Sequence, residues 1–140
     1  MSAIGLPLVG LVLTLGASAA AAEVVAVVSA NGPVVSLSKN QVTDIFLGKT
    51  SRFPDGTPAV PIDQIEGSAA RDEFYSTFAG KSPAQLKAHW SKIIFTGRGQ
   101  PPMAVSNSIE VKKHVVETPN AIGYIEKTLM DGSVKVLLTQ

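Results

Sequence analysis

The sequence predicts a single α/β domain with a mixed sheet flanked by helices. Apolar runs of strand length recur between residues 23 and 138, and segments with helical periodicity and capping residues separate them. Strands that alternate with helices are typical of two-layer or three-layer α/β domains. Without its first 22 residues the chain keeps about 118, a length that suits one core rather than two.

The first half of the domain begins with a Val-rich strand, expected at residues 23–29 because β-branched side chains favour strands. A short helix follows, with Ser38 as N-cap, Gln41 at N3 of a capping box and Gly48 just past its end. A polar loop over residues 49–57 leads to a second strand at 59–63.

A Gly67-Ser68 turn follows this strand and opens a helix expected over residues 69–79. The next helix has the start signals Ser82, Pro83 and Gln85. We expect one buried stripe on it, formed by Leu86, Trp90, Ile93 and Ile94.

The last third begins with a loop over residues 96–102, where two glycines and two prolines exclude a helix. A helix is expected over 109–117, capped by Ser108 and with its three valines facing inward: Val111, Val115 and Val116. Strands are expected at 121–125 and 134–138.

The first 22 residues have the pattern of a secretory signal peptide. They contain no charged residue, and the apolar stretch over residues 4–15 precedes small residues that suit cleavage after Ala22 or, alternatively, Ala19. No Lys or Arg precedes the apolar stretch, so the true start codon stays open. The apolar stretch is shorter than the roughly 20 residues of a membrane span, which favours cleavage and a soluble periplasmic protein.

Composition argues against several classes of function. A net charge of +1 without a basic cluster disfavours nucleic acid as a partner, and the absence of cysteine excludes thiolate metal sites. His89 and His114 have no carboxylates at ligand spacing, so we expect no metal and no cofactor. Asp63 and Glu66 are interpreted as solvated surface carboxylates rather than an acid and base pair. No catalytic residues are expected, and the chain is not predicted to be an enzyme.

The Gly67-Ser68 turn is the candidate site for an anion. Free N–H groups and the positive end of the dipole at a helix start attract phosphate or carboxylate. Arg71 and Arg98 are the cations expected to face a shared crevice with it. The alternatives are that the turn binds nothing, that Arg71 pairs with Glu66 or another acid, and that Arg98 is a solvated loop residue.

Three segments resemble the phosphate-binding proteins of bacterial ABC transporters, a family of periplasmic type II solute-binding proteins. They are LSKNQVTDIFLGK at 37–49, the strand with its Gly67-Ser68 turn, and TPNAIGYIE at 118–126. The resemblance covers residues 34–126 and implies a fold like one lobe of a two-lobed binding protein.

The resemblance also implies a function. In that family an Arg and a Ser-Gly-Thr turn hold phosphate, and Gln64, Gly67 and Ser68 occupy the matching positions here. Gln64 lacks the positive charge of that Arg, and Glu66 opposes an anion, so weak binding is expected. The chain is thus expected to bind a phosphate-like anion weakly or to act as an accessory or sensory module of phosphate uptake, with an ABC permease or another membrane protein as a possible partner. The alternative is a protein-interaction module that has lost its ligand.

Overall fold

The computed structural model describes Gly5, residues 23–34 and residues 36–137. Apart from Gly5, the predicted leader lies outside the described residues, as does Leu138 of the last predicted strand. No helix among the described residues has the length and apolarity that crossing a membrane requires. The elements are β1 (Val24–Ser29), α1 (Lys39–Phe46), β2 (Val60–Gln64), α2 (Ala69–Phe74), η1 (Tyr75–Ala79), α3 (Pro83–Phe95), β3 (Met103–Val105), α4 (Ser108–Glu117), β4 (Ala121–Glu126), η2 (Lys127–Leu129) and β5 (Val134–Val136).

The five strands form one mixed sheet in the order β3-β2-β4-β1-β5. β2 runs parallel to both β3 and β4, whereas β1 pairs antiparallel with β4 and β5. Because β2, β3 and β4 point the same way, their carboxyl ends share one edge of the sheet. The helices α2 and α4 start near that edge.

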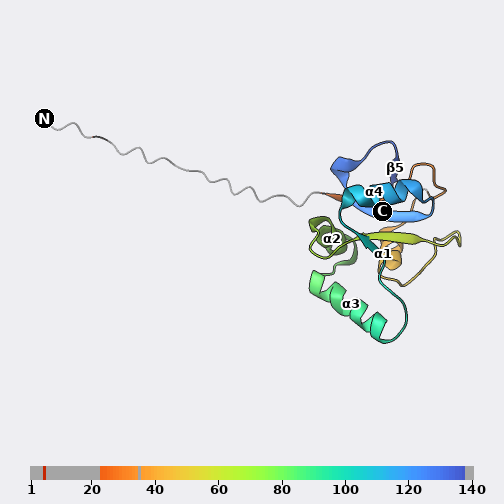
Figure 1. Ribbon diagram of the computed structural model, residues 1–140, viewed down its shortest axis with the longest axis vertical. Coiled ribbons are helices and arrows are strands. Elements are labelled where there is room, and N and C mark those ends of the chain that lie inside the picture. The colour runs from red at the N-terminus through yellow and green to blue at the C-terminus, as the bar shows by residue number, and fades with distance from the viewer. Residues whose placement is uncertain (1–4, 6–22, 35, 138–140) are drawn as a thin grey trace.

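Helices cover both faces of the sheet and make a three-layer domain (Figure 1). Alternate residues of β1 separate the two cores: Val24, Ala26 and Val28 pack with α1, α2 and α3, while Val27 packs with α4. At Gly123 of β4 the helix α4 comes so close that an added Cβ would lie 2.4 Å from Cγ1 of Val111. Only glycine fits this contact without a shift of the helix.

Two capping boxes start α1 and α3 as the sequence predicts. Ser38 and Gln41 exchange bonds at 3.1 and 2.8 Å, and Ser82 and Gln85 do so at 3.2 and 2.9 Å. The helix expected over residues 69–79 is present, but it is α-helical only to Phe74 and continues as the π-helix η1.

Three local expectations are wrong, and one strand has no counterpart among the expectations. The short edge strand β3 was not anticipated, and the N-cap of α4 is Asn107, whose side chain accepts from the Glu110 N–H at 3.0 Å, rather than Ser108. Val116 is exposed. Ile94 is also exposed, at 56%, because the far half of α3 has no layer to pack against.

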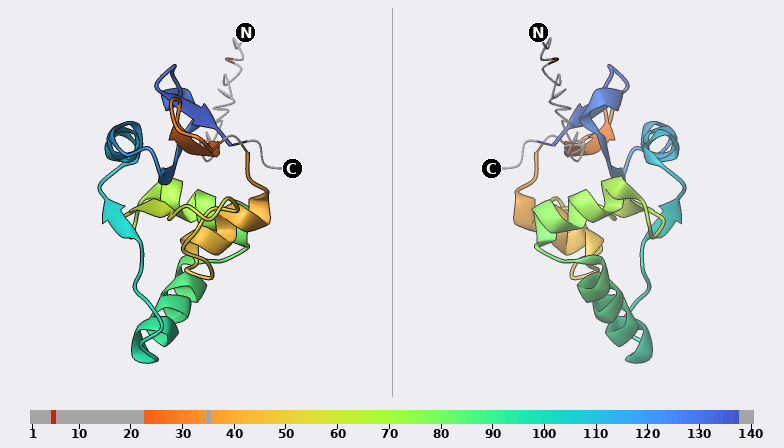
Figure 2. Two further views of the ribbon diagram at one scale, coloured as in Figure 1. Left: turned by 90° about the vertical axis from the view of Figure 1, so that its right-hand side faces the viewer. Right: turned by 90° about the vertical axis from the view of Figure 1, so that its left-hand side faces the viewer.

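The helix α3 projects from the body of the domain, and the loop after it returns the chain to β3 (Figure 2). Only Leu86 and Trp90 are buried on this helix. The carbonyl of Leu47, just after α1, contacts His89 Nε2 at 2.8 Å and holds α3 against the domain.

Candidate functional site

A buried carboxylate lies at the carboxyl end of β2. Asp63 is only 2% exposed and accepts hydrogen bonds from Tyr75, at 2.5 Å, and from Tyr124. The expectation of a solvated carboxylate is therefore wrong for Asp63, because the two tyrosines, from η1 and β4, enclose it. Glu66 is exposed, as expected.

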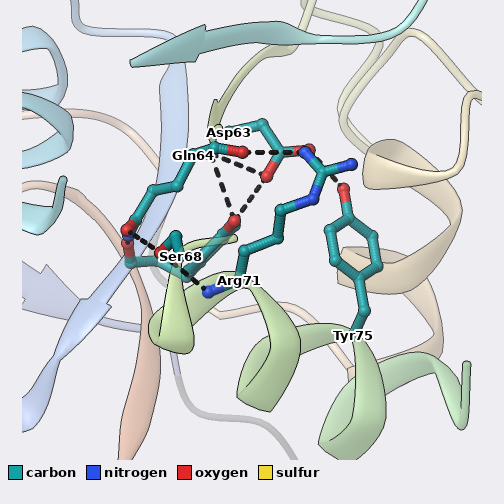
Figure 3. A network of polar contacts seen from close by, with 6 residues as sticks. Asp63, Gln64, Ser68, Arg71 and Tyr75 are labelled. Atoms are coloured by element: carbon teal, nitrogen blue, oxygen red, sulfur yellow. Dashed lines mark hydrogen bonds and ion pairs between the residues drawn. The ribbon is translucent and has the colours of Figure 1, made fainter. Parts of the chain in front are cut away.

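Arg71 forms an ion pair with Asp63. Its Nη1 lies 3.4 Å from Asp63 Oδ2 and donates to the Gln64 carbonyl at 2.7 Å (Figure 3). The guanidinium also lies over the ring of Tyr75, 5.5 Å from its centroid. Arg71 thus pairs with an acid, as one of the open alternatives held, although this acid is Asp63 rather than Glu66.

Gln64 connects three elements through its side-chain amide. Its Oε1 accepts from the Ser68 hydroxyl at 2.7 Å, and its Nε2 donates to Ser108 Oγ at 3.1 Å and to the Tyr124 carbonyl at 3.2 Å. Ser68 Oγ also accepts from the Arg71 N–H at 3.2 Å and so caps α2. The structure therefore brings Gln64, Ser68 and Arg71 together: the side chains of Ser68 and Gln64 bond to each other, and the Arg71 guanidinium bonds to the backbone of Gln64 (Figure 3).

The two tyrosines are held in their protonated form. Burial, followed by the negative charge of Asp63 and the hydrogen bond to it, raises the pKa of Tyr75 and that of Tyr124 well above the ordinary value. Both hydroxyls consequently remain donors to Asp63 over the whole physiological pH range.

Free donors remain at the turn itself. The backbone N–H groups of Gly67, Ala69 and Ala70 have no hydrogen-bond acceptor among the described residues. Gly67 adopts a positive φ of 89° and lines a shallow pocket of about 300 Å³. Two cations and two acids also line this pocket: Arg71, Lys87, Glu66 and Asp72. The pocket can accept an anion, but its carboxylates oppose a strongly charged one.

Arg98 lies elsewhere. It is exposed and lines a larger groove beside α3, whose lining residues do not include Arg71. The sequence-predicted residues thus divide between two places: Gln64, Gly67, Ser68 and Arg71 at the carboxyl end of β2, and Arg98 at the groove.

Four residues of the network were not among the predicted site residues: Asp63, Tyr75, Ser108 and Tyr124. The sequence contains one signal for Asp63, namely an acidic residue directly after the apolar Ile62 in a strand. A carboxylate in a strand with two covered faces needs donors, and the chain has only two tyrosines to supply phenol groups.

The described residues give no constellation for metal binding, since no group of three or more His, Asp or Glu side chains converges among them. His89 and His114 lie on different helices, α3 and α4. The carboxylate of Asp63 is enclosed by its partners and is 2% exposed, so its contacts join β2, η1 and β4 inside the fold.

Comparison with solved structures identifies the fold. The chain is similar to a protein described as a phosphate ABC transporter substrate-binding protein from Clostridium perfringens, solved with bound phosphate, at a TM-score of 0.67 and 24% identity. It is also similar to an ABC-type phosphate transport receptor from Vibrio cholerae, at 0.65 and 19%. A third similar structure is PstS from Borrelia burgdorferi, at 0.63 and 14%.

The matches cover 84–85% of this chain and 45–47% of the matched chains, so the chain spans about half the length of these proteins. No protein-family model and no curated protein matches the sequence. The predicted fold, an α/β domain with a mixed sheet that resembles part of a phosphate-binding protein, is confirmed.

Proposed function

We propose that this chain is a secreted, solute-binding-like protein that binds phosphate or another small oxyanion weakly at the start of α2. The observation that carries the proposal is the group of free N–H donors at Gly67, Ala69 and Ala70 at the carboxyl edge of a parallel strand. In α/β sheets this edge is where ligands commonly bind. The shared fold with phosphate-binding proteins supports the same ligand class.

Weak binding follows from the charges around the donors. Arg71 is already engaged by Asp63 and Gln64, and the Ser68 hydroxyl is engaged by Gln64. Lys87 is then the cation of the pocket without an ion pair among the described residues, while Glu66 and Asp72 repel an anion. An accessory or sensory role in phosphate uptake, with an ABC permease as partner, fits such an affinity better than capture of scarce phosphate.

Isothermal titration with phosphate and sulfate at low ionic strength tests the proposal. We expect saturable heat that Glu66→Gln strengthens and Lys87→Gln weakens, because each changes one charge beside the donors. Lys113→Gln, on the exposed side of α4, is the matched control and should leave the affinity unchanged. Absence of heat with every anion, or an equal effect of Lys113→Gln, would contradict an anion site at this turn.

Export is the second part of this proposal. The charge-free leader favours a mature protein that begins at or near Glu23 and resides in the periplasm. Intact mass of the protein in the periplasmic fraction checks this, and a mass that retains Met1 would contradict cleavage.

A protein-interaction module is the second candidate, and exposed apolar side chains favour it. Phe95 is 93% exposed and Ile94 is 56% exposed on the projecting end of α3, and Ile65 is exposed near the anion pocket. A photo-crosslinking residue at position 95 should then capture one specific membrane-protein partner in cells, whereas the same residue at position 113 should not. Saturable anion binding without such a crosslink would favour the first candidate.

A further inference from the structure

A groove of about 740 Å³ lies between the loop after α1, the helix α3 and the loop that leads to β3. It reaches Val60 and Pro61 at the amino end of β2. The groove is thus at the opposite end of that strand from Gln64 and the anion pocket. The helix α3 and the loop after it form one side of the groove, and Figure 2 shows how both project from the domain.

The charges that line the groove all have one sign. Lys49, Arg52 and Arg98 line it, and no Asp or Glu does. None of the three cations forms an ion pair among the described residues. Arg52 donates to the carbonyl of Gly56 at 2.8 Å, which orders its guanidinium without neutralising it. Three unpaired cations around one cavity favour an anionic occupant.

Part of the groove lining is apolar. Ile45 and Trp90 are buried residues that line the groove, together with the partly buried Ile93. Gly48 packs directly on the indole, since a Cβ built there would lie 3.0 Å from it. The groove thus has an apolar lining beside its three cations.

We infer that this groove is a binding site for a small organic anion with an apolar body, such as an aromatic or aliphatic carboxylate, sulfonate or phosphate ester. The charge selects the anionic head, and the wall of Ile45, Trp90 and Ile93 contacts the apolar body. The volume lies within the roughly 300–1,000 Å³ of small-molecule sites. The inference is independent of the proposed phosphate site, because the two sites share neither a cation nor a lining loop.

A matched pair of fluorescent probes tests this inference. Anilinonaphthalene sulfonate carries an aromatic body and a sulfonate, and N-phenylnaphthylamine has the same body without the charge. We expect the sulfonate to bind at least about tenfold more tightly, as hydrogen bonds to charged groups would give. Trp90 is the sole tryptophan of the chain, so energy transfer from it to the sulfonate reports that the probe is bound, and the variants below locate the probe.

Variants separate the groove from other surfaces. The double variant Lys49→Gln/Arg98→Gln should weaken binding of the sulfonate by about tenfold, while Lys113→Gln on α4 should not change it. Phe95→Ala removes the exposed ring outside the groove and should also leave the affinity unchanged. All these side chains are exposed, so circular dichroism and melting temperature should match the parent protein.

Four outcomes would overturn the inference. Equal affinity for both probes would show that charge has no role, and a Phe95→Ala variant that loses binding would place the probe on the projecting helix. A double variant that binds the sulfonate like the parent would show that Lys49 and Arg98 do not contribute to binding. Displacement of the sulfonate by millimolar phosphate, with loss in Lys87→Gln, would assign the probe to the pocket of Gly67 instead.

Discussion

Arg71 and Arg98 carry the same guanidinium group in two contrasting regions of the molecule. At the carboxyl end of β2, Arg71 is mostly buried, at 14% exposure, and contacts Asp63, Gln64 and Tyr75. In the groove at the amino end of β2, Arg98 is exposed and has no ion pair among the described residues. The same side chain is thus bonded within the fold in one region and exposed to solvent in the other. Substitutions in both regions test this contrast.

The largest effect is expected from Asp63→Ala. The substitution leaves Arg71 without its acid and two buried phenol groups without an acceptor, which should cost about 3–5 kcal/mol. Urea denaturation measures the free energy of unfolding. Asp72→Ala, on the exposed side of α2, is the control and should change it by less than about 0.5 kcal/mol. Equal effects of the two variants would contradict a structural role for the network.

Trp90→Ala should cost about 3 kcal/mol, the lower end of the range for a buried tryptophan, because α3 packs against the domain through few side chains. The same denaturation experiment measures it. A change below about 1 kcal/mol would instead mark Trp90 as a residue that faces only the ligand.

Arg71→Gln and Arg98→Gln compare the two regions directly. Arg71→Gln removes a bond to the Gln64 carbonyl and the partner of Asp63, so it should lower the free energy of unfolding by about 1–3 kcal/mol. Arg98→Gln should stay within about 0.5 kcal/mol of the parent. Thermal melting of both proteins in one buffer checks the difference. A larger loss of stability in Arg98→Gln than in Arg71→Gln would assign the structural role to Arg98 instead.

The dependence of the free energy of unfolding on pH above about pH 10 reports on Tyr75 and Tyr124. In the unfolded chain they ionise near pH 10, whereas the folded protein keeps both protonated to higher pH. Their contribution to stability is thus present below about pH 10 and is lost above it, at about 1.4 kcal/mol per pH unit for each tyrosine. In Tyr75→Phe the part of this slope due to tyrosine should be halved. Denaturation at several alkaline pH values measures the slope, and an unchanged slope would contradict the raised pKa of Tyr75.

Local features of the fold could be predicted from the sequence. Ser38 with Gln41 and Ser82 with Gln85 start helices because a capping box is completed within four residues. Features that depend on distant residues could not be predicted. The burial of Asp63 depends on Tyr75 and Tyr124, which are 12 and 61 residues further along the chain.

The same reason explains the two apolar residues that were placed incorrectly. Ile94 has the helical spacing of a buried residue, but spacing does not show where the neighbouring layer ends, and α3 extends beyond it. Val116 likewise lies one position past Val115, which closes the contact between α4 and the sheet. Of the candidate site, the grouping of Gln64, Ser68 and Arg71 could be foreseen from their spacing around one turn. The bonds that orient the Gln64 amide could not be foreseen, because Nε2 donates to the distant Ser108 and Tyr124.

The order of the strands has a consequence for folding kinetics. β1 is the first strand of the sheet in sequence, yet both of its neighbours, β4 and β5, lie in the last fifth of the chain. A chain that stops before Ala121 therefore offers β1 no partner, and closing the sheet requires loops of nearly the whole domain. Such non-local pairing is typical of domains that fold in milliseconds to seconds rather than microseconds. The Val-rich segment of β1 thus stays unpaired until synthesis is almost complete.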